Sequence, residues 1–116
     1  MPVYCFHYFL SILHSADNNL EHKHSHTLEI VIYLSGEIDK SARFDTIEKY
    51  AEDYLRQYEN EYLNILPEFE QNANIENIGD VFFEGIEREL EQHGLLLERL
   101  EIGETPLRTY IVTREL

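Results

Sequence analysis

The chain has 116 residues, of which 43% are hydrophobic, and its formal net charge is −14. A chain of this length can bury a core without disulfides, so we expect a single domain spanning residues 1–116. Eight tyrosines and six phenylalanines argue against a disordered acidic chain. Only nine lysines and arginines are present, so the composition argues against a nucleic-acid partner.

The single cysteine and the apolar N-terminus indicate the cellular compartment. One cysteine cannot form an internal disulfide, and Cys5 lies in an apolar stretch where a small buried thiol is common. No lysine or arginine precedes this stretch and His7 interrupts it, so it does not fit a signal peptide. No later run approaches the roughly 20 apolar residues of a membrane span. We therefore expect a cytoplasmic protein with no membrane contact.

Two strands are predicted at the start of the chain. Nearly every residue from Val3 to His14 is aromatic, β-branched or aliphatic, which is typical of a strand covered on both faces. After the polar residues 15–21, a second strand begins at His24 and ends near Gly36. Its apolar residues alternate with more polar ones, with Leu28, Ile30, Ile32 and Leu34 on one face.

Two helices and two strands follow. Apolar residues at helical spacing predict a helix over about residues 43–60: Phe44, Ile47, Ala51, Tyr54, Leu55 and Tyr58. Asn74 is a plausible N-cap for a second helix, which His93-Gly94 ends. Residues 95–102 and 107–113 predict two short strands joined by a turn at 103–106.

The predicted order ββααββ defines an α+β fold. Such a chain forms a four-stranded antiparallel sheet with two helices on one face. The sheet would have two open edges, which natural proteins blunt or pair with another subunit. We therefore expect a homo-oligomer.

Three histidines fall on one predicted sheet face. His24 and His26 are two residues apart on a strand, so their side chains project from the same face about 7 Å apart, close enough to share one ion. His14 ends the preceding strand on the same parity as its apolar residues, and nine residues separate it from His24. Three imidazoles could form a catalytic-type zinc site with one open coordination position. The spacing alone leaves a solvated histidine-rich loop as an equal alternative.

Several short motifs occur in a characteristic order. A histidine ends the first strand, and His24-x-His26 opens a strand that closes in Ser-Gly-Glu-Ile-Asp at residues 35–39. Further motifs are Tyr-Leu-Asn at residues 62–64 followed by Pro67, Asn-x-Glu at 74–76, and Gly-Glu-Thr at 103–105. In this combination the chain resembles the family of 6-pyruvoyltetrahydropterin and 6-carboxytetrahydropterin synthases. The resemblance covers almost the whole chain and implies the tunnelling fold (T-fold) of that family.

The resemblance also implies site residues, a cofactor and an assembly. The family's three zinc ligands fall on His14, His24 and His26, and its pterin-binding Glu-Thr pair falls on Glu104 and Thr105. A carboxylate suits a pterin ring edge because it accepts two parallel hydrogen bonds. Without the resemblance, Glu104 would be interpreted as a solvated turn residue. The family also implies a homo-oligomer, a hexamer of two stacked trimers, with sites between subunits.

The chain departs from the family at its proton-transfer residues. Leu20 and Asn60 stand where the synthases typically have a cysteine and a histidine, and neither residue titrates near neutrality. Glu21 precedes His24 by three residues and resembles the glutamate that replaces the cysteine in one subgroup of the family. It is the candidate catalytic base. The alternative is that Glu21 is one more surface acid among 23.

The sequence thus supports two main functions. One is a zinc-dependent enzyme that acts on the C6 side chain of a reduced pterin by elimination, tautomerisation or retro-aldol cleavage, as a carbon–oxygen lyase or an aldolase-like enzyme. The other is a zinc-containing homologue that binds a pterin or a purine-like ligand without turnover. A third reading, in which zinc only ties the two N-terminal strands together, also remains open.

Overall fold

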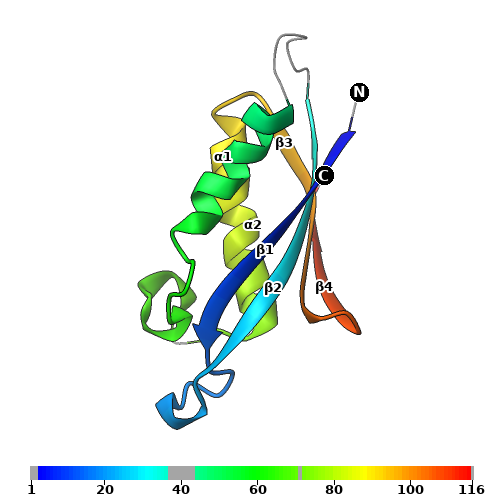
Figure 1. The fold of residues 1–116 in the computed structure, drawn as a ribbon. Coiled ribbons are helices and arrows are strands. Elements are labelled where there is room, and N and C mark those ends of the chain that lie inside the picture. The colour runs from blue at the N-terminus through cyan, green and yellow to red at the C-terminus, as the bar shows by residue number, and fades with distance from the viewer. Residues whose placement is uncertain (1–2, 37–43, 71, 116) are drawn as a thin grey trace.

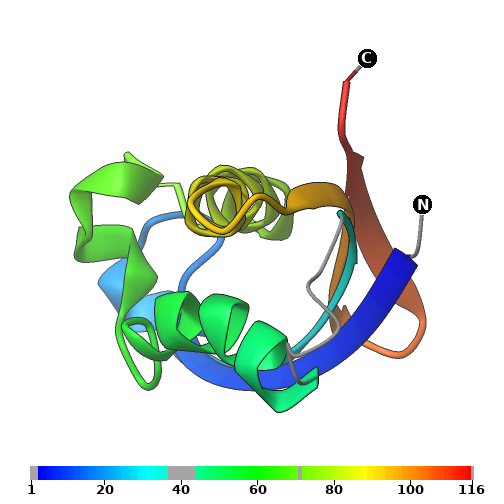
Figure 2. The ribbon, with the colours of Figure 1, turned by 90° about the horizontal axis from the view of Figure 1, so that it is seen from above.

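A computed structural model describes residues 3–36, 44–70 and 72–115. Its four-stranded antiparallel sheet has the order β1-β2-β3-β4. The bounds of the strands are Val3–His14 for β1, His24–Ser35 for β2, Leu96–Thr105 for β3 and Arg108–Thr113 for β4. Helices α1 (Phe44–Arg56) and α2 (Ile75–Glu91) lie on one face of the sheet, as Figures 1 and 2 show. The predicted ββααββ order and α+β class are confirmed.

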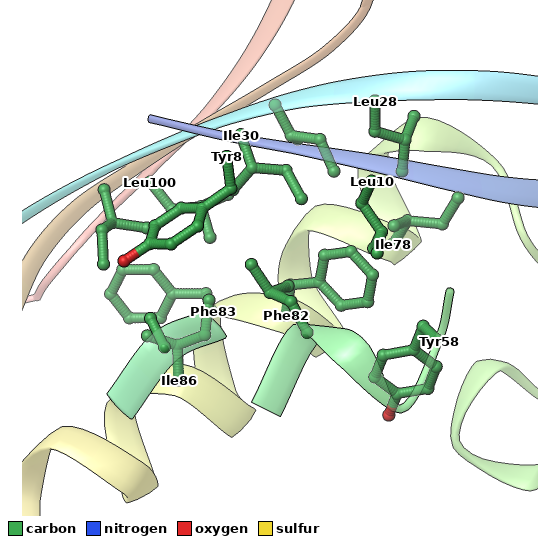
Figure 3. Close-up of a cluster of buried hydrophobic side chains, with 14 of the residues drawn as sticks. Tyr8, Leu10, Leu28, Ile30, Tyr58, Ile78, Phe82, Phe83, Ile86 and Leu100 are labelled. Atoms are coloured by element: carbon green, nitrogen blue, oxygen red, sulfur yellow. The ribbon is translucent and has the colours of Figure 1, made fainter. Parts of the chain in front are cut away.

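The core lies between the sheet and the two helices. Strands bury alternate residues, and the even-numbered residues of β1 and β2 point toward the helices, where α2 contributes Ile78, Phe82 and Ile86. Figure 3 shows these side chains meeting in one layer. Fully buried residues include Leu10, Ile12, Leu28, Ile30, Ile32, Leu34, Leu100 and Ile102.

The outer face of β1 is exposed within the chain. Val3 and Phe9 are 62% and 63% exposed, and Cys5 is an exposed free thiol. The predictions of a strand covered on both faces and of a buried Cys5 are therefore wrong for the single chain. The physical reason is that both helices lie on one side of the sheet, so no described element covers the odd-numbered residues of β1.

The helix boundaries differ from the prediction mainly at the C-terminal end of α1. Helix α1 ends at Arg56, earlier than the predicted residue 60, because Tyr58 N–H donates to the Leu55 carbonyl at 3.0 Å and Asn60 adopts a left-handed φ of 61°. Helix α2 begins as predicted, with the Asn74 side chain accepting a hydrogen bond from Asn77 N–H at 2.8 Å. Residue 43 and residues 37–39 of the Ser-Gly-Glu-Ile-Asp motif lie outside the described residues.

The last hairpin is tighter than predicted. Strand β3 continues to Thr105, so only residues 106–107 form the turn. Its pairing with β4 shifts register between Ile102 and Thr105. Gly103 permits the close approach of these strands, because a Cβ atom there would lie 2.8 Å from the Arg108 carbonyl oxygen. Glu104 lies within this irregularity.

Neither described helix combines the length and apolarity that a membrane crossing requires.

Candidate metal centre

The first two strands bring three histidines together at one end of the sheet. His14 ends β1 directly opposite His24, which begins β2, and His26 lies opposite Ile12. One ligand nitrogen from each ring lies within 4.8 Å of the other two. The ring centroids are 4.5 to 5.2 Å apart. The structure therefore brings together the three histidines that the alternation of strand residues placed on one face.

Backbone carbonyls orient two of the rings. His14 Nδ1 donates to the Ala73 carbonyl at 2.7 Å, and His24 Nδ1 donates to the His22 carbonyl at 2.9 Å. Each bond holds the proton on Nδ1 and leaves the Nε2 lone pair free, the arrangement that metal-binding histidines require. His14 is 1% exposed, and its Nε2 has no hydrogen-bond partner among the described residues. A buried nitrogen without a partner is costly unless it binds a ligand.

The electrostatics of the cluster also favour a neutral His14 ring. Burial lowers the pKa of His14, and this effect outweighs the opposite effects of the Ala73 carbonyl and the Glu104 carboxylate. The neighbouring His24 and His26 lower it further. A neutral imidazole is the form that binds a metal ion, so the residues present fit a divalent cation with nitrogen ligands, such as zinc.

Glu104 approaches the same cluster from β3. Its Oε1 lies 3.4 Å from His14 Nε2, and its Oε2 lies 3.7 Å from His26 Nε2. Its side chain is 29% exposed, so it is neither buried nor the solvated turn residue that its sequence position alone suggested. Thr105 follows it in β3, and its Oγ1 accepts a hydrogen bond from Leu107 N–H at 3.3 Å.

A pocket of about 450 Å³ adjoins the cluster through Glu104. The end of the β3–β4 hairpin and the start of α2 form its walls. The lining residues are Ile75, Glu76, Glu104, Thr105, Leu107, Arg108, Thr109 and Tyr110. A pocket with apolar walls and a few polar groups is the usual form of a small-molecule site, and both predicted pterin-binding residues lie in this one.

The structure does not join Glu21 to the cluster. Glu21 is exposed in the 3-10 turn Leu20–His22, where its backbone N–H donates to the Asn19 side chain at 3.0 Å. In the ranges that the structure covers, its carboxylate forms no hydrogen bond or ion pair. Leu20 is 64% exposed and lines a separate pocket of about 480 Å³.

Asn60 has a backbone role. Its N–H donates to the Ser11 carbonyl at 2.7 Å, and its left-handed φ of 61° is one that asparagine adopts more readily than most residues. The residue therefore shapes the turn after α1. Its side chain is a neutral amide, so no group that titrates near neutrality stands at this position.

Sequence reasoning missed several residues that build the site. The Ala73 and His22 carbonyls that orient the rings carry no signal in the sequence, because any residue has a carbonyl group. Glu76 lines the pocket with Glu104, and its place in the Asn-x-Glu motif at the start of α2 was the available signal. Buried Asn64 was visible in the Leu-Asn motif, and it binds both backbone groups of Ser15 directly after His14.

The fold has well-defined counterparts among solved structures. The 6-pyruvoyl tetrahydropterin synthase of Caenorhabditis elegans is 18% identical, with a TM-score of 0.72 and coverage of 99% of this chain and 98% of that one. The Plasmodium falciparum enzyme is 11% identical, with a TM-score of 0.70 and the same coverage. A Plasmodium vivax synthase with a catalytic glutamate replaced by alanine is 10% identical, with a TM-score of 0.65 over all of both chains. The chain therefore has the fold of pterin synthases.

The sequence itself supports a closer assignment. The model of the 6-pyruvoyl tetrahydropterin synthase family matches residues 6–115. The chain belongs to this family. No protein with a curated function matches it in sequence.

Proposed function

We propose that this chain is a zinc-dependent protein that acts on the C6 side chain of a reduced pterin. The observation that carries the proposal is the histidine cluster. Within residues 3–36, 44–70 and 72–115 the buried His14 Nε2 has no hydrogen-bond partner, and two other imidazole nitrogens lie within 4.8 Å of it. Membership of the synthase family supports the pterin as ligand. The reaction class is an elimination, a tautomerisation or a retro-aldol cleavage, and the whole chain would act as one domain.

Each site residue has a proposed role. His14, His24 and His26 hold zinc, which supplies a Lewis acid for the oxygen atoms of the side chain. Glu104 and Thr105 bind the pterin ring in the pocket of about 450 Å³. A carboxylate accepts paired hydrogen bonds from an amino group and a ring N–H, which is what this edge of a pterin offers.

Glu21 is the proposed catalytic base. Support comes from the Plasmodium vivax synthase, in which a glutamate is a catalytic residue. Glu21 precedes the His24-x-His26 pair by three residues, and the turn that carries it leads directly into β2. An exposed carboxylate in such a turn would need to approach the substrate when the ligand binds.

A binding protein without turnover is the second candidate function. Leu20 and Asn60 favour this binding function. They occupy the positions where the synthases typically have a cysteine and a histidine, and neither side chain can transfer a proton. The same zinc and the same pocket would then retain a pterin or a purine-like ligand.

We further propose that the chain works as a homo-oligomer, a hexamer of two stacked trimers, in the cytoplasm. The sheet ends in β1 and β4. Residues 60–62 bond to β1 at Ser11 and Leu13, which leaves the edge of β4 and the N-terminal part of the β1 edge for a neighbouring subunit to pair. The single cysteine is free, which fits a reducing compartment.

Zinc content and pterin retention test the proposal. The unmodified protein should bind one zinc ion per chain and retain a reduced pterin, and His24→Ala should lose the zinc. His7→Ala is the matched control, because His7 is exposed on the outer face of β1 and should leave the zinc content unchanged. Unchanged zinc in His24→Ala would refute the metal centre.

Turnover then separates the two candidate functions. If the protein converts a reduced pterin, Glu21→Gln should abolish conversion while zinc and pterin remain bound. Full activity of Glu21→Gln would assign proton transfer to another group. Retention of pterin without conversion in the unmodified protein would establish the binding function.

A further inference from the structure

The turn between β3 and β4 carries an apolar side chain into solvent. Leu107 is 91% exposed and forms this turn with Pro106. Glycine, proline, asparagine, aspartate and serine dominate such turns because of their backbone conformations or their side-chain hydrogen bonds, and leucine has neither advantage. The turn itself therefore gives no reason for a leucine at this position, whereas a contact with a second molecule would give one.

A pocket of about 480 Å³ lies at the turn between β1 and β2. Residues between α1 and α2 form its other wall, and it shares no lining residue with the pocket at Glu104. Leu20 and Ile65 at this pocket are 64% and 72% exposed, so apolar surface faces solvent here in an acidic chain. The lining residues are Asn18, Leu20, Tyr62, Asn64, Ile65, Leu66, Pro67 and Glu70. The pocket is thus open and largely apolar, as a site for a leucine side chain requires.

The sheet can continue from one copy of the chain to the next. Each strand is antiparallel to its neighbour in the order β1-β2-β3-β4, so β1 and β4 run in opposite directions. A second copy that places its β4 beside β1, with its helices on the same face, therefore forms an antiparallel pair. Residues 60–62 already bond to Ser11 and Leu13 of β1, which leaves residues 3–10 of this edge for the six residues of β4.

This arrangement brings the hairpin of the second copy to the pocket. Strand β4 begins at Arg108 and β1 ends at His14, so antiparallel pairing places the start of β4 nearest the end of β1 that residues 60–62 cover. The chain continues from there through Tyr62 to Leu66, and these residues line the pocket. The turn that precedes β4 in one copy thus lies beside the pocket of the other.

Charge complementarity supports the same contact. Arg108 directly follows Leu107, and Glu70 is the charged residue among those that line the pocket. Both charged side chains are exposed, and neither forms an ion pair in the part of the chain that the structure describes. An arginine and a glutamate on two copies can therefore meet without giving up an ion-pair partner within their own chains.

We propose that Leu107 of one copy inserts into the pocket of about 480 Å³ of a second copy, with Arg108 beside Glu70 of that copy. This contact rests on the homo-oligomer proposed above and specifies which surfaces of the two copies meet. The hairpin and the pocket are different surfaces, so the contact is head-to-tail, and its repetition builds a ring rather than a symmetric dimer. Each copy in the ring supplies one hairpin and one pocket.

Crosslinking between two differently tagged chains tests the contact. In a Cys5→Ser background, which removes the native thiol, one chain carries Ile65→Cys at the pocket and the other carries Pro106→Cys beside Leu107. A short bis-maleimide should link the two chains when they are co-expressed, and adding Leu107→Glu to the second chain should remove most of the linked product. In the control, Phe44→Cys replaces Ile65→Cys: Phe44 is 65% exposed on α1, outside the pocket, and should not be linked.

The strength of association provides a second readout. Leu107→Glu should raise the dissociation constant about ten- to hundredfold, because the burial of a leucine side chain no longer contributes. Arg108→Glu and Glu70→Arg should each weaken association, and the two together should restore part of it. Sedimentation measures these changes, and circular dichroism verifies that each variant is folded.

The outcomes separate this contact from the oligomer itself. Equal yields of linked product from the Ile65→Cys and Phe44→Cys chains, or unchanged association of Leu107→Glu, would overturn the inference and leave the proposed oligomer intact. Failure of the paired charge reversals to restore association would refute the pairing of Arg108 with Glu70. A 13.8 kDa species at every salt concentration would refute the contact together with the oligomer.

Discussion

Asn64 holds the loop that leaves the first metal ligand. Its side chain accepts from Ser15 N–H at 2.9 Å, donates to the Ser15 carbonyl at 2.7 Å and donates to the Asn18 side chain at 3.0 Å. Both Ser15 and Asn64 are buried, so no solvent replaces these bonds. The residue thereby fixes the chain direction immediately after His14.

Asn64→Ala should lower the free energy of unfolding by about 1–3 kcal/mol, because the buried Ser15 N–H loses its hydrogen-bond acceptor, while the Ser15 carbonyl keeps the Asn18 N–H at 3.3 Å. Urea denaturation measures the change. Asn19→Ala is the control: Asn19 is exposed, and its side chain caps only the short turn at Glu21, so its loss should cost less. Equal costs for the two variants would contradict the role given to Asn64.

The individual site residues were only partly predictable. Strand parity was sufficient to place His14, His24 and His26 on one face, because a period of two is fixed by backbone geometry. The approach of Glu104 to His14 was not predictable, since it depends on the pairing of strands separated by about 75 residues and on a bulge. The neutral state of His14 depends on burial by distant elements and on the Ala73 carbonyl.

At the scale of the elements, the two helices pack through a glycine. Gly85 of α2 is buried against the ring of Tyr54 from α1, and a Cβ atom at Gly85 would overlap Tyr54 Cζ. The Tyr54 hydroxyl also reaches the Val81 carbonyl at 3.4 Å. Burial raises the pKa of Tyr54, so the ring remains neutral in this contact.

Gly85→Ala should destabilise the protein by about 1–3 kcal/mol, the usual cost of forcing a methyl group into a packed interface. Helix propensity alone would predict the opposite change in stability, because it favours alanine over glycine by about 1 kcal/mol. Thermal or urea unfolding measures the effect. In a Tyr54→Leu background the same substitution should cost less, because the atoms that the methyl group would meet are gone. A stabilising Gly85→Ala in the unmodified background would show that Tyr54 moves aside freely.

Most helices and strands were predictable from local sequence patterns. The predictions that were wrong, the end of α1 and the burial of the outer face of β1, depend on tertiary contacts. The bounds of β1 and the Asn74 cap of α2 follow from alternation and capping chemistry alone. The early end of α1 follows from the turn at residues 57–60, where the chain bonds back to Ser11 of β1. The exposed outer face of β1 has a tertiary cause: in the part of the chain that the structure describes, both helices lie on the other face of the sheet, and the apolar composition of the strand does not reveal this.

At the scale of the whole molecule, two features act against each other. Association with other copies is favoured by the strand edges of β4 and of the N-terminal part of β1, and by the exposed side chains of Val3 and Phe9. A net charge of −14 on 116 residues opposes it, because identical acidic subunits repel one another. The salt concentration should therefore decide how much of the proposed oligomer forms.

The protein should sediment as an oligomer at micromolar concentration near physiological salt and dissociate as the salt concentration falls. Repulsion between acidic subunits extends about 8 Å at 0.15 M salt and about 30 Å at 0.01 M, so low salt strengthens it while edge pairing and apolar contacts change little. Sedimentation velocity across this range measures the shift, and circular dichroism at each salt concentration verifies that the subunits stay folded. A stable 13.8 kDa species at every salt concentration would refute the oligomer. An oligomer that dissociates only at high salt would show that ion pairs between subunits, rather than strand edges, hold it together.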